Sequence, residues 1–100
     1  MNAMKNYVIF RRSGWSSREE LEKAAGRSAR VGQAEMADRV RWIRSYITQE
    51  ADHRLGTVCV YQAIDQESLR EHARRSELPC DLIVPVLEAV IINEDPLIAA

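Results

Sequence analysis

The 100-residue sequence contains no apolar run long enough to span a membrane, since its longest hydrophobic stretches, residues 83–87 and 89–92, are separated by Glu88. It has two cysteines and no apolar segment of a signal peptide near its start, so a disulfide framework is not expected. Fourteen Lys and Arg against fifteen Asp and Glu give a net charge of −1, which provides no overall attraction for nucleic acid or anionic lipid. These absences favour a cytoplasmic protein in which Cys59 and Cys80 are reduced.

The sequence also lacks the short motifs of common catalytic and metal sites. It has no Gly-x-Ser-x-Gly nucleophile turn, no glycine-rich phosphate loop, and no HxxxH, CxxC or HxH spacing. Residues 55–59 lack the base-stacking aromatics that RNA-recognition sheets carry. Any site must therefore be assembled by the fold, and we expect neither nucleic acid nor a membrane as a partner.

The order of expected elements is βαββαβ, which predicts an α+β fold of the ferredoxin-like type, with a four-stranded antiparallel sheet and both helices on one face. Ser17 and Glu20 form a capping box that starts the first helix near Arg18, and Asp65 caps the second helix. The expected strands are residues 7 to about 12, 40–48, 57–61 and 82–92, and the expected helices are residues 18 to about 36 and 66 to about 77.

A single domain is expected over residues 1–100, with residues 1–4 as an added or disordered start and residues 93–100 as a C-terminal tail. Gly26 and Gly32 predict that the first helix is bent or loose. Residues 82–92 are almost continuously apolar, which is typical of a strand covered on both faces, although Pro85 lacks a ladder N–H and indicates an edge strand or a bulge.

Aromatic residues on the second expected strand suggest a buried second face. Trp42 and Tyr46 fall on one side of a regular strand, and Ile43 and Ile47 fall on the other, so both sides need cover. Because two short helices cover only one face of a sheet, we expect a homodimer in which Trp42 or Tyr46 is buried. Alternatively, Trp42, Tyr46 and Tyr61 line a pocket for a flat organic ligand.

Arginines are concentrated on the first two expected strands. Arg11 and Arg12 end the first strand, and Arg41 and Arg44 lie on the second. On adjacent strands they form a basic patch that can hold an anionic ligand. Solvated strand ends explain the same residues equally well.

Several segments resemble a family of small bacterial proteins of unknown function whose members are often labelled nickel-binding proteins. The most specific segments are residues 69–75 (LREHARR) and 78–81 (LPCD), and residues 40–48 (VRWIRSYIT) and 59–63 (CVYQA) support them. The resemblance covers roughly residues 7–96. It implies a ferredoxin-like fold, a dimer, and a bound nickel or other divalent ion.

Under this resemblance His72 is the candidate metal ligand, with Cys59, Tyr61 and Gln62 as the nearest residues to complete the shell. Nickel-type ions take imidazole, thiolate and carboxylate donors. This chain departs from the family pattern at Phe10 and Gln62, which stand where acidic residues are usual. We therefore expect weak metal binding or none.

Each candidate ligand also has an ordinary structural interpretation. His72 fits a buried histidine bonded to a neighbour, and Cys59 fits a small apolar residue in a strand. The alternative metal ligand is His53, which lies beside Asp52 in the expected hairpin turn between the second and third strands.

Three functional hypotheses remain. The preferred one is a small non-enzymatic protein that binds a small molecule or a divalent metal. The second is a cofactor-independent enzyme, similar to dimeric ferredoxin-like monooxygenases or isomerases, which requires a pocket between helices and sheet that contains His72. The third is a dimerisation or regulatory module, which is favoured if there is no pocket.

Overall fold

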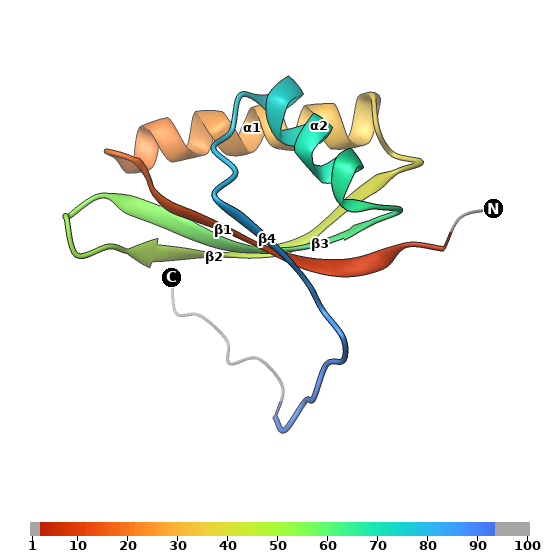
Figure 1. Ribbon diagram of the computed structural model, residues 1–100. Coiled ribbons are helices and arrows are strands. Elements are labelled where there is room, and N and C mark those ends of the chain that lie inside the picture. Colours follow the sequence, from red (N-terminus) through yellow and green to blue (C-terminus); the bar gives the residue numbers. More distant parts are fainter. Residues whose placement is uncertain (1–2, 94–100) are drawn as a thin grey trace.

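The computed structural model describes residues 3–93, which form one antiparallel sheet with two helices on one of its faces (Figure 1). The sheet has the strand order β2-β3-β1-β4. The expected ferredoxin-like α+β fold is confirmed, whereas the expectations for residues 1–2 and 94–100 lie outside the described residues. The elements are β1 (Lys5–Trp15), α1 (Arg18–Ala34), β2 (Val40–Gln49), β3 (Leu55–Ala63), α2 (Gln66–Ser76) and β4 (Leu82–Pro85).

Both helices begin at the predicted caps. The Ser17 hydroxyl accepts a hydrogen bond from the backbone N–H of Glu20 at 3.2 Å, and the Asp65 carboxylate accepts one from the N–H of Ser68 at 2.8 Å. Each bond satisfies a backbone donor that the first turn of a helix leaves free. At its other end α2 stops at Glu77, whose left-handed backbone (φ 56°) turns the chain away from the helix.

The two glycines of α1 do not interrupt the helix. The helix runs continuously from Arg18 to Ala34. A methyl group added at Gly26 would meet nothing within 4 Å, whereas one added at Gly32 would lie 3.6 Å from Nε2 of His72. Gly32 therefore lets α1 pass close to His72 of α2.

Strand β1 is longer than expected, because it continues through the Ser13-Gly14 pair. Its pairing with β3 shifts register between Arg11 and Trp15, and Ser13 has a left-handed backbone (φ 49°). These features are those of a β-bulge, which bends a strand without ending it. As a result Trp15 still pairs with Leu55 and belongs to the sheet.

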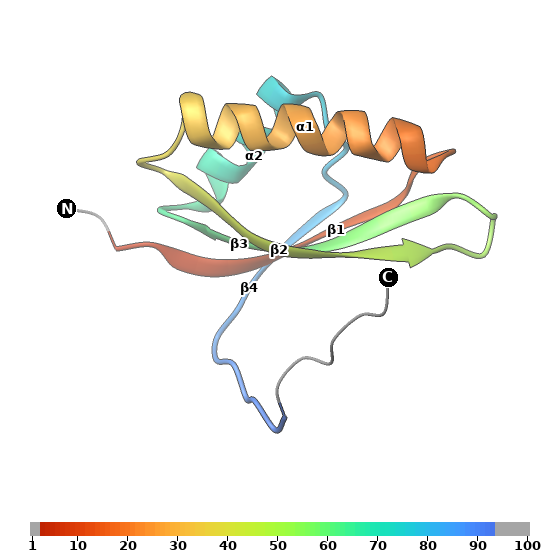
Figure 2. The ribbon, with the colours of Figure 1, turned by 180° about the vertical axis from the view of Figure 1, so that it is seen from behind.

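Strand β4 is shorter than expected and ends at Pro85. Proline has no backbone N–H for the ladder, and one further bond, from the N–H of Val86 to the carbonyl of Asn6 at 2.9 Å, closes the pairing. Residues 86–93 then leave the sheet on the side away from the helices (Figure 2). The expected continuous strand to Ile92 is therefore wrong, and its apolar side chains, such as the fully exposed Leu87, lie outside the sheet.

A bulge in β2 changes which side chains face the helices. Trp42 pairs with Tyr61 and Arg44 pairs with Val60, so Ile43 is an extra residue with no partner position on β3. Because paired residues point to the same side of a sheet, Trp42 faces the helices, while Tyr46, opposite Val58, faces away. The expectation that Trp42 and Tyr46 share a face is wrong.

The main core lies between the helices and the inner face of the sheet, and a smaller cluster of Trp15, Leu21 and Ala24 lies beside it. In residues 3–93 neither helix is long and apolar enough to cross a membrane. The main core consists of Tyr7, Ile9, Val31, Met36, Val40, Cys59, Tyr61, Ala63, Leu69 and Ile83.

Candidate functional site

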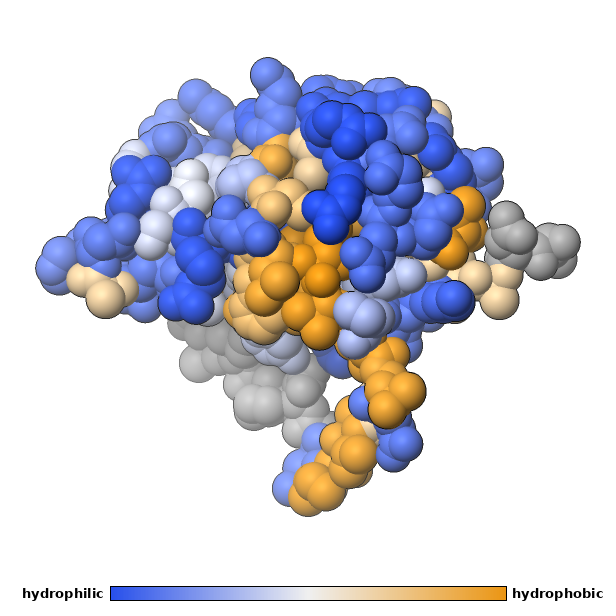
Figure 3. Space-filling view, in the orientation of Figure 1, coloured by the Kyte–Doolittle hydropathy of each residue, from blue (hydrophilic) through white to orange (hydrophobic). Residues whose placement is uncertain are grey.

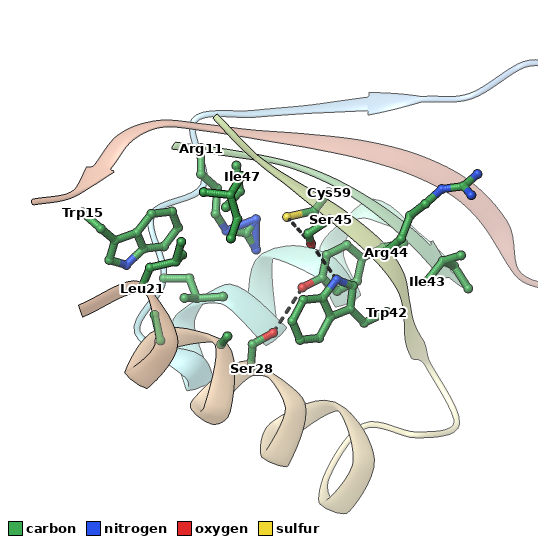
Figure 4. A pocket seen from close by; sticks show the side chains of 15 residues that line it. Arg11, Trp15, Leu21, Ser28, Trp42, Ile43, Arg44, Ser45, Ile47 and Cys59 are labelled. Atoms are coloured by element: carbon green, nitrogen blue, oxygen red, sulfur yellow. Dashed lines mark hydrogen bonds between the residues drawn. The ribbon is translucent and has the colours of Figure 1, made fainter. Parts of the chain in front are cut away.

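A cavity of about 500 Å³ lies between α1 and the inner face of the sheet, between the two core clusters (Figure 4). Its size falls within the range of small-molecule sites in proteins. Its floor is formed by β1, β2 and β3, and its roof is formed by Ala24, Ala25 and Ser28 of α1. Because these three side chains are small, α1 covers the sheet here without filling the space below it.

Trp42 forms an aromatic wall of this pocket together with Tyr61. Their rings are stacked, with centroids 6.1 Å apart and planes 8° from parallel. The indole N–H of Trp42 donates to Oγ of Ser45 at 2.7 Å, and that hydroxyl donates to Sγ of Cys59 at 3.0 Å. This chain of contacts fixes the orientation of the indole, although Trp42 itself is 37% exposed at the edge of the sheet.

The phenol of Tyr61 connects the sheet to α1. Its hydroxyl lies 3.1 Å from Oγ of Ser28, within hydrogen-bond distance. Burial raises the pKa of Tyr61 above its ordinary value, although the positive charge of Arg11 opposes the shift. The phenol is therefore protonated at neutral pH and acts in the pocket as a hydrogen-bonding group rather than as a base.

Arg11 enters the pocket from β1, between Trp15 and Trp42 (Figure 4). Only 1% of it is exposed, and its guanidinium carbon lies 5.9 Å from the centre of the Tyr61 ring. None of its three side-chain nitrogens has a hydrogen-bond partner within residues 3–93. Arg12, the next residue, points to the other side of the sheet and bonds to Glu50 at 2.5 Å. The expected basic patch therefore separates. Arg11 and Arg44 both line the pocket, but Arg44 is exposed and pairs with Val60 on the face away from the helices, so Arg11 is the member of the patch whose side chain points into the pocket (Figure 4).

Of the expected metal ligands, His72 is buried between the helices and the sheet. Its Nε2 lies 3.1 Å from the carbonyl oxygen of Ser28, which can only accept, so Nε2 carries the proton of the neutral ring. Burial is the main cause that lowers the pKa of His72 below its ordinary value. Its Nδ1 is an acceptor with no partner among the described residues. His72 does not line the pocket.

The structure brings Cys59 and Tyr61 to the same side of the sheet as His72, but not Gln62. The Tyr61 and His72 rings are 5.6 Å apart. Gln62 follows Tyr61 on β3 and therefore points to the opposite face, where Phe10 also lies. Within residues 3–93 no three His, Cys, Asp or Glu side chains are grouped so that they could hold a metal ion. Both cysteines are free thiols, with Cys59 buried and Cys80 half-buried.

The alternative ligand His53 is exposed in the turn between β2 and β3, as its position in the sequence predicts. Its backbone is left-handed (φ 68°). The neighbouring Asp52 carboxylate accepts a hydrogen bond from the N–H of Arg54 at 3.0 Å, and this bond is the main cause that lowers the pKa of Asp52. The carboxylate therefore organises the turn.

Trp15 and Thr57 line the pocket although the sequence assigned no role to them, and Arg11 was assigned only to a basic patch with Arg12, Arg41 and Arg44. A signal for Arg11 was present, since it continues the alternation of Tyr7 and Ile9, both of which face the core. Trp15 gave no such signal, because it follows the bulge at Ser13, where the alternation breaks.

Both a protein family and a solved structure resemble this chain. A family model described as "Nickel responsive protein SCO4226-like" matches residues 7–86. Among solved structures, the crystal structure of SCO4226 from Streptomyces coelicolor A3(2) has a TM-score of 0.66 at 13% sequence identity, over 85% of this chain and 99% of that one. At this identity the likeness shows a shared fold. No curated protein sequence matches the chain.

Proposed function

The chain belongs to the SCO4226-like family of nickel responsive proteins, and we propose that it is a small non-enzymatic binding protein whose ligand occupies the pocket between α1 and the sheet. The observation that supports this proposal is the pocket itself. Its walls are aromatic and aliphatic, and Arg11 is a polar group with unused hydrogen-bond donors, a combination typical of ligand sites.

The composition of the lining favours binding over catalysis. An enzyme of the type considered above would use His72 in the pocket, but the lining contains Ser28 and Tyr61 at that end instead, and these two bond to each other. The raised pKa of Tyr61 removes it as a general base at neutral pH. The other polar side chains of the lining can bind a ligand through hydrogen bonds or charge.

A neutral fluorescent probe tests this proposal. N-phenyl-1-naphthylamine emits strongly in apolar pockets, and we expect its emission to rise with the wild-type protein. Ala25→Phe should abolish the rise, because Ala25 lies in the roof of the pocket. Gly26→Phe is the matched control, since Gly26 is the next residue of α1, lies outside this lining, and has open space around an added Cβ. Equal probe binding by both variants would place the probe elsewhere and refute the proposal.

Nickel binding through His72 is the second candidate function. The family description and the free acceptor Nδ1 of His72 favour it. The donor set does not fit, however: the described residues hold no group of three ligands, and Gln62 and Phe10 lie on the face away from His72. A nickel site at His72 would therefore need donors other than the His, Cys, Asp and Glu side chains of these residues.

Calorimetric titration with nickel tests this second candidate. We expect weak binding at most, and any such binding should disappear in His72→Ala and persist in His53→Ala. Tight binding that survives His72→Ala would exclude His72 and favour the turn that holds His53 and Asp52. Because His72 and Gln62 face opposite sides of the sheet, Gln62→Glu should not strengthen a site at His72.

A further inference from the structure

The guanidinium of Arg11 is a buried charge without a hydrogen-bond or ion-pair partner in the described residues. Arg11 is 1% exposed, and Nε, Nη1 and Nη2 all lack hydrogen bonds to any group in residues 3–93. A buried, unpaired cation is strongly unfavourable, so buried arginines are normally paired with an acid or hydrogen-bonded on every side. Here none of the residues that line the pocket is Asp or Glu. A ligand that enters the pocket can therefore provide the partner that Arg11 lacks.

Thr57, on the neighbouring strand, adds a second buried polar group without a hydrogen bond in the described residues. It lies directly opposite Arg11 on the β1–β3 ladder, lines the same pocket, and is 5% exposed. Its hydroxyl also has no hydrogen-bond partner within the described part of the chain. Together the guanidinium and the hydroxyl form a donor-rich spot on the pocket floor, and a planar guanidinium donates two parallel hydrogen bonds to a carboxylate.

The rest of the pocket is apolar and partly flat. Trp42 is held parallel to Tyr61, Trp15 closes the other end, and Leu21 and Ile47 lie between them. Aromatic rings bind well against such walls. The pocket therefore combines one buried guanidinium, that of Arg11, with space for a flat hydrocarbon body.

We propose that the pocket binds a flat monocarboxylic acid with an aromatic body, whose carboxylate pairs with Arg11 and Thr57 and whose ring lies against Trp42 and Tyr61. This inference rests on the proposed function and specifies its ligand class. One carboxylate balances the one buried guanidinium, that of Arg11, whereas a doubly charged phosphate monoester would bring a second negative charge into the apolar interior, away from the exposed Arg44. The carboxylate also supplies the partner that Arg11 lacks.

The test compares ligands that share one ring system. By calorimetry at pH 7, we expect 2-naphthoate to bind the wild-type protein at least tenfold more tightly than the neutral 2-naphthamide, and more tightly than 2-naphthyl phosphate. Tighter binding of the phosphate would refute the carboxylate class. Equal binding of naphthoate and naphthamide would refute the role of Arg11 but leave the proposed function standing. If neither ligand binds and N-phenyl-1-naphthylamine also fails, the proposed function itself is wrong.

Arg11→Met provides the matching variant. Methionine replaces the guanidinium with an apolar side chain, so naphthoate affinity should fall to that of naphthamide, while naphthamide affinity is unchanged. Arg12→Met removes the same charge one residue along β1 on the other side of the sheet and should leave both affinities unchanged. Naphthoate that keeps its advantage in Arg11→Met would overturn the proposal.

Thermal unfolding separates a ligand-binding role from a structural one. Without ligand, Arg11→Met should unfold at the same temperature as the wild type or higher, because it removes an uncompensated buried cation. Naphthoate should raise the unfolding temperature of the wild type but not that of the variant. A much lower unfolding temperature for ligand-free Arg11→Met would show that Arg11 stabilises the fold itself and would refute the proposal. Thr57→Val, which should weaken naphthoate binding several-fold, gives an independent check.

Discussion

Trp42 and Tyr46 lie four residues apart on β2 but face opposite sides of the sheet. In a regular strand residues separated by four positions share a face, so the bulge at Ile43 accounts for the difference. Trp42 is thereby stacked on Tyr61 in the pocket, and Tyr46 is placed opposite Val58 on the face that the helices leave open. The two aromatic residues can therefore be tested as separate probes of the two faces.

Truncation of Trp42 should weaken binding in the pocket, whereas truncation of Tyr46 should not. We expect Trp42→Ala to reduce the affinity for N-phenyl-1-naphthylamine by about three- to tenfold, which is the usual contribution of one aromatic contact. Tyr46→Ala is the control from the same strand. Fluorescence titration of both variants provides the measurement, and an equal loss in the two variants would contradict the assignment of faces.

The sheet face away from the helices, called here the open sheet face, carries Tyr46. We propose that a second copy of the chain covers this face. Apolar side chains occupy the face and continue along residues 86–93 below the sheet; Figure 3 shows hydrophobic residues along this projecting segment. Ordinary monomers seldom expose so much contiguous apolar surface. The apolar side chains on the open sheet face are Val8, Phe10, Tyr46, Val58, Val60, Leu82 and Val84, and Arg44 and Gln62 lie on the same face.

Sedimentation velocity tests this homodimer. We expect the wild type to be a dimer at micromolar concentration, and we expect Tyr46→Glu or Val84→Glu to be monomeric, because each places a charge on the open sheet face. Arg70→Glu, on the exposed side of α2, should remain dimeric. Trp42→Glu should disturb the pocket more than the dimer, since Trp42 faces the helices. A monomeric wild type would refute the interface.

Local sequence signals were sufficient to predict the order of elements and the helix caps. Ser17 and Asp65 each determine a helix start through one hydrogen bond to a residue three positions on, so the relevant information is contiguous. The bulges at Ser13 and Ile43 were missed because they depend on pairing with β3, a distant strand. Consequently the faces of β2 after Trp42 were predicted incorrectly.

Stability should decrease on mild acidification because of His72. Burial lowers its pKa in the folded protein below the ordinary value of 6.5, so the unfolded chain binds more protons as the pH falls below that value. The free energy of unfolding, measured by urea titration in the presence of a chelator, should therefore decrease between pH 7 and pH 5. His72→Asn should lose this pH dependence and the exposed His53→Asn should keep it. The same slope in His72→Asn and the wild type would contradict this explanation.

Two glycine substitutions should change stability in opposite directions. Gly26→Ala should raise the free energy of unfolding by about 0.5–1 kcal/mol, since it lies within α1 and its added methyl group meets nothing. Gly56→Ala should lower it by about 1–3 kcal/mol, because the new methyl group would lie 2.7 Å from the carbonyl oxygen of Arg11. Urea denaturation gives both values. A stable Gly56→Ala would mean that β1 and β3 can move apart.

The candidate site was less predictable than the fold. The aromatic residues Trp42 and Tyr61 were recognised as possible pocket walls, but the sequence could not show that Arg11 lacks a partner. That property depends on the absence of an acid from four separate elements that meet at the pocket. His72 attracted attention through the family resemblance, and the structure places it outside the pocket lining with its Nε2 already bonded to Ser28.

The bulge in β2 also makes this strand tolerant of a change in length. Ile43 is the residue without a counterpart on β3, so a chain from which it had been deleted would retain the pairs of Trp42 with Tyr61 and of Ser45 with Cys59. Every side chain beyond the deletion would keep its present face. We therefore expect position 43 to be a place where relatives gain or lose one residue while both the pocket and the open sheet face survive.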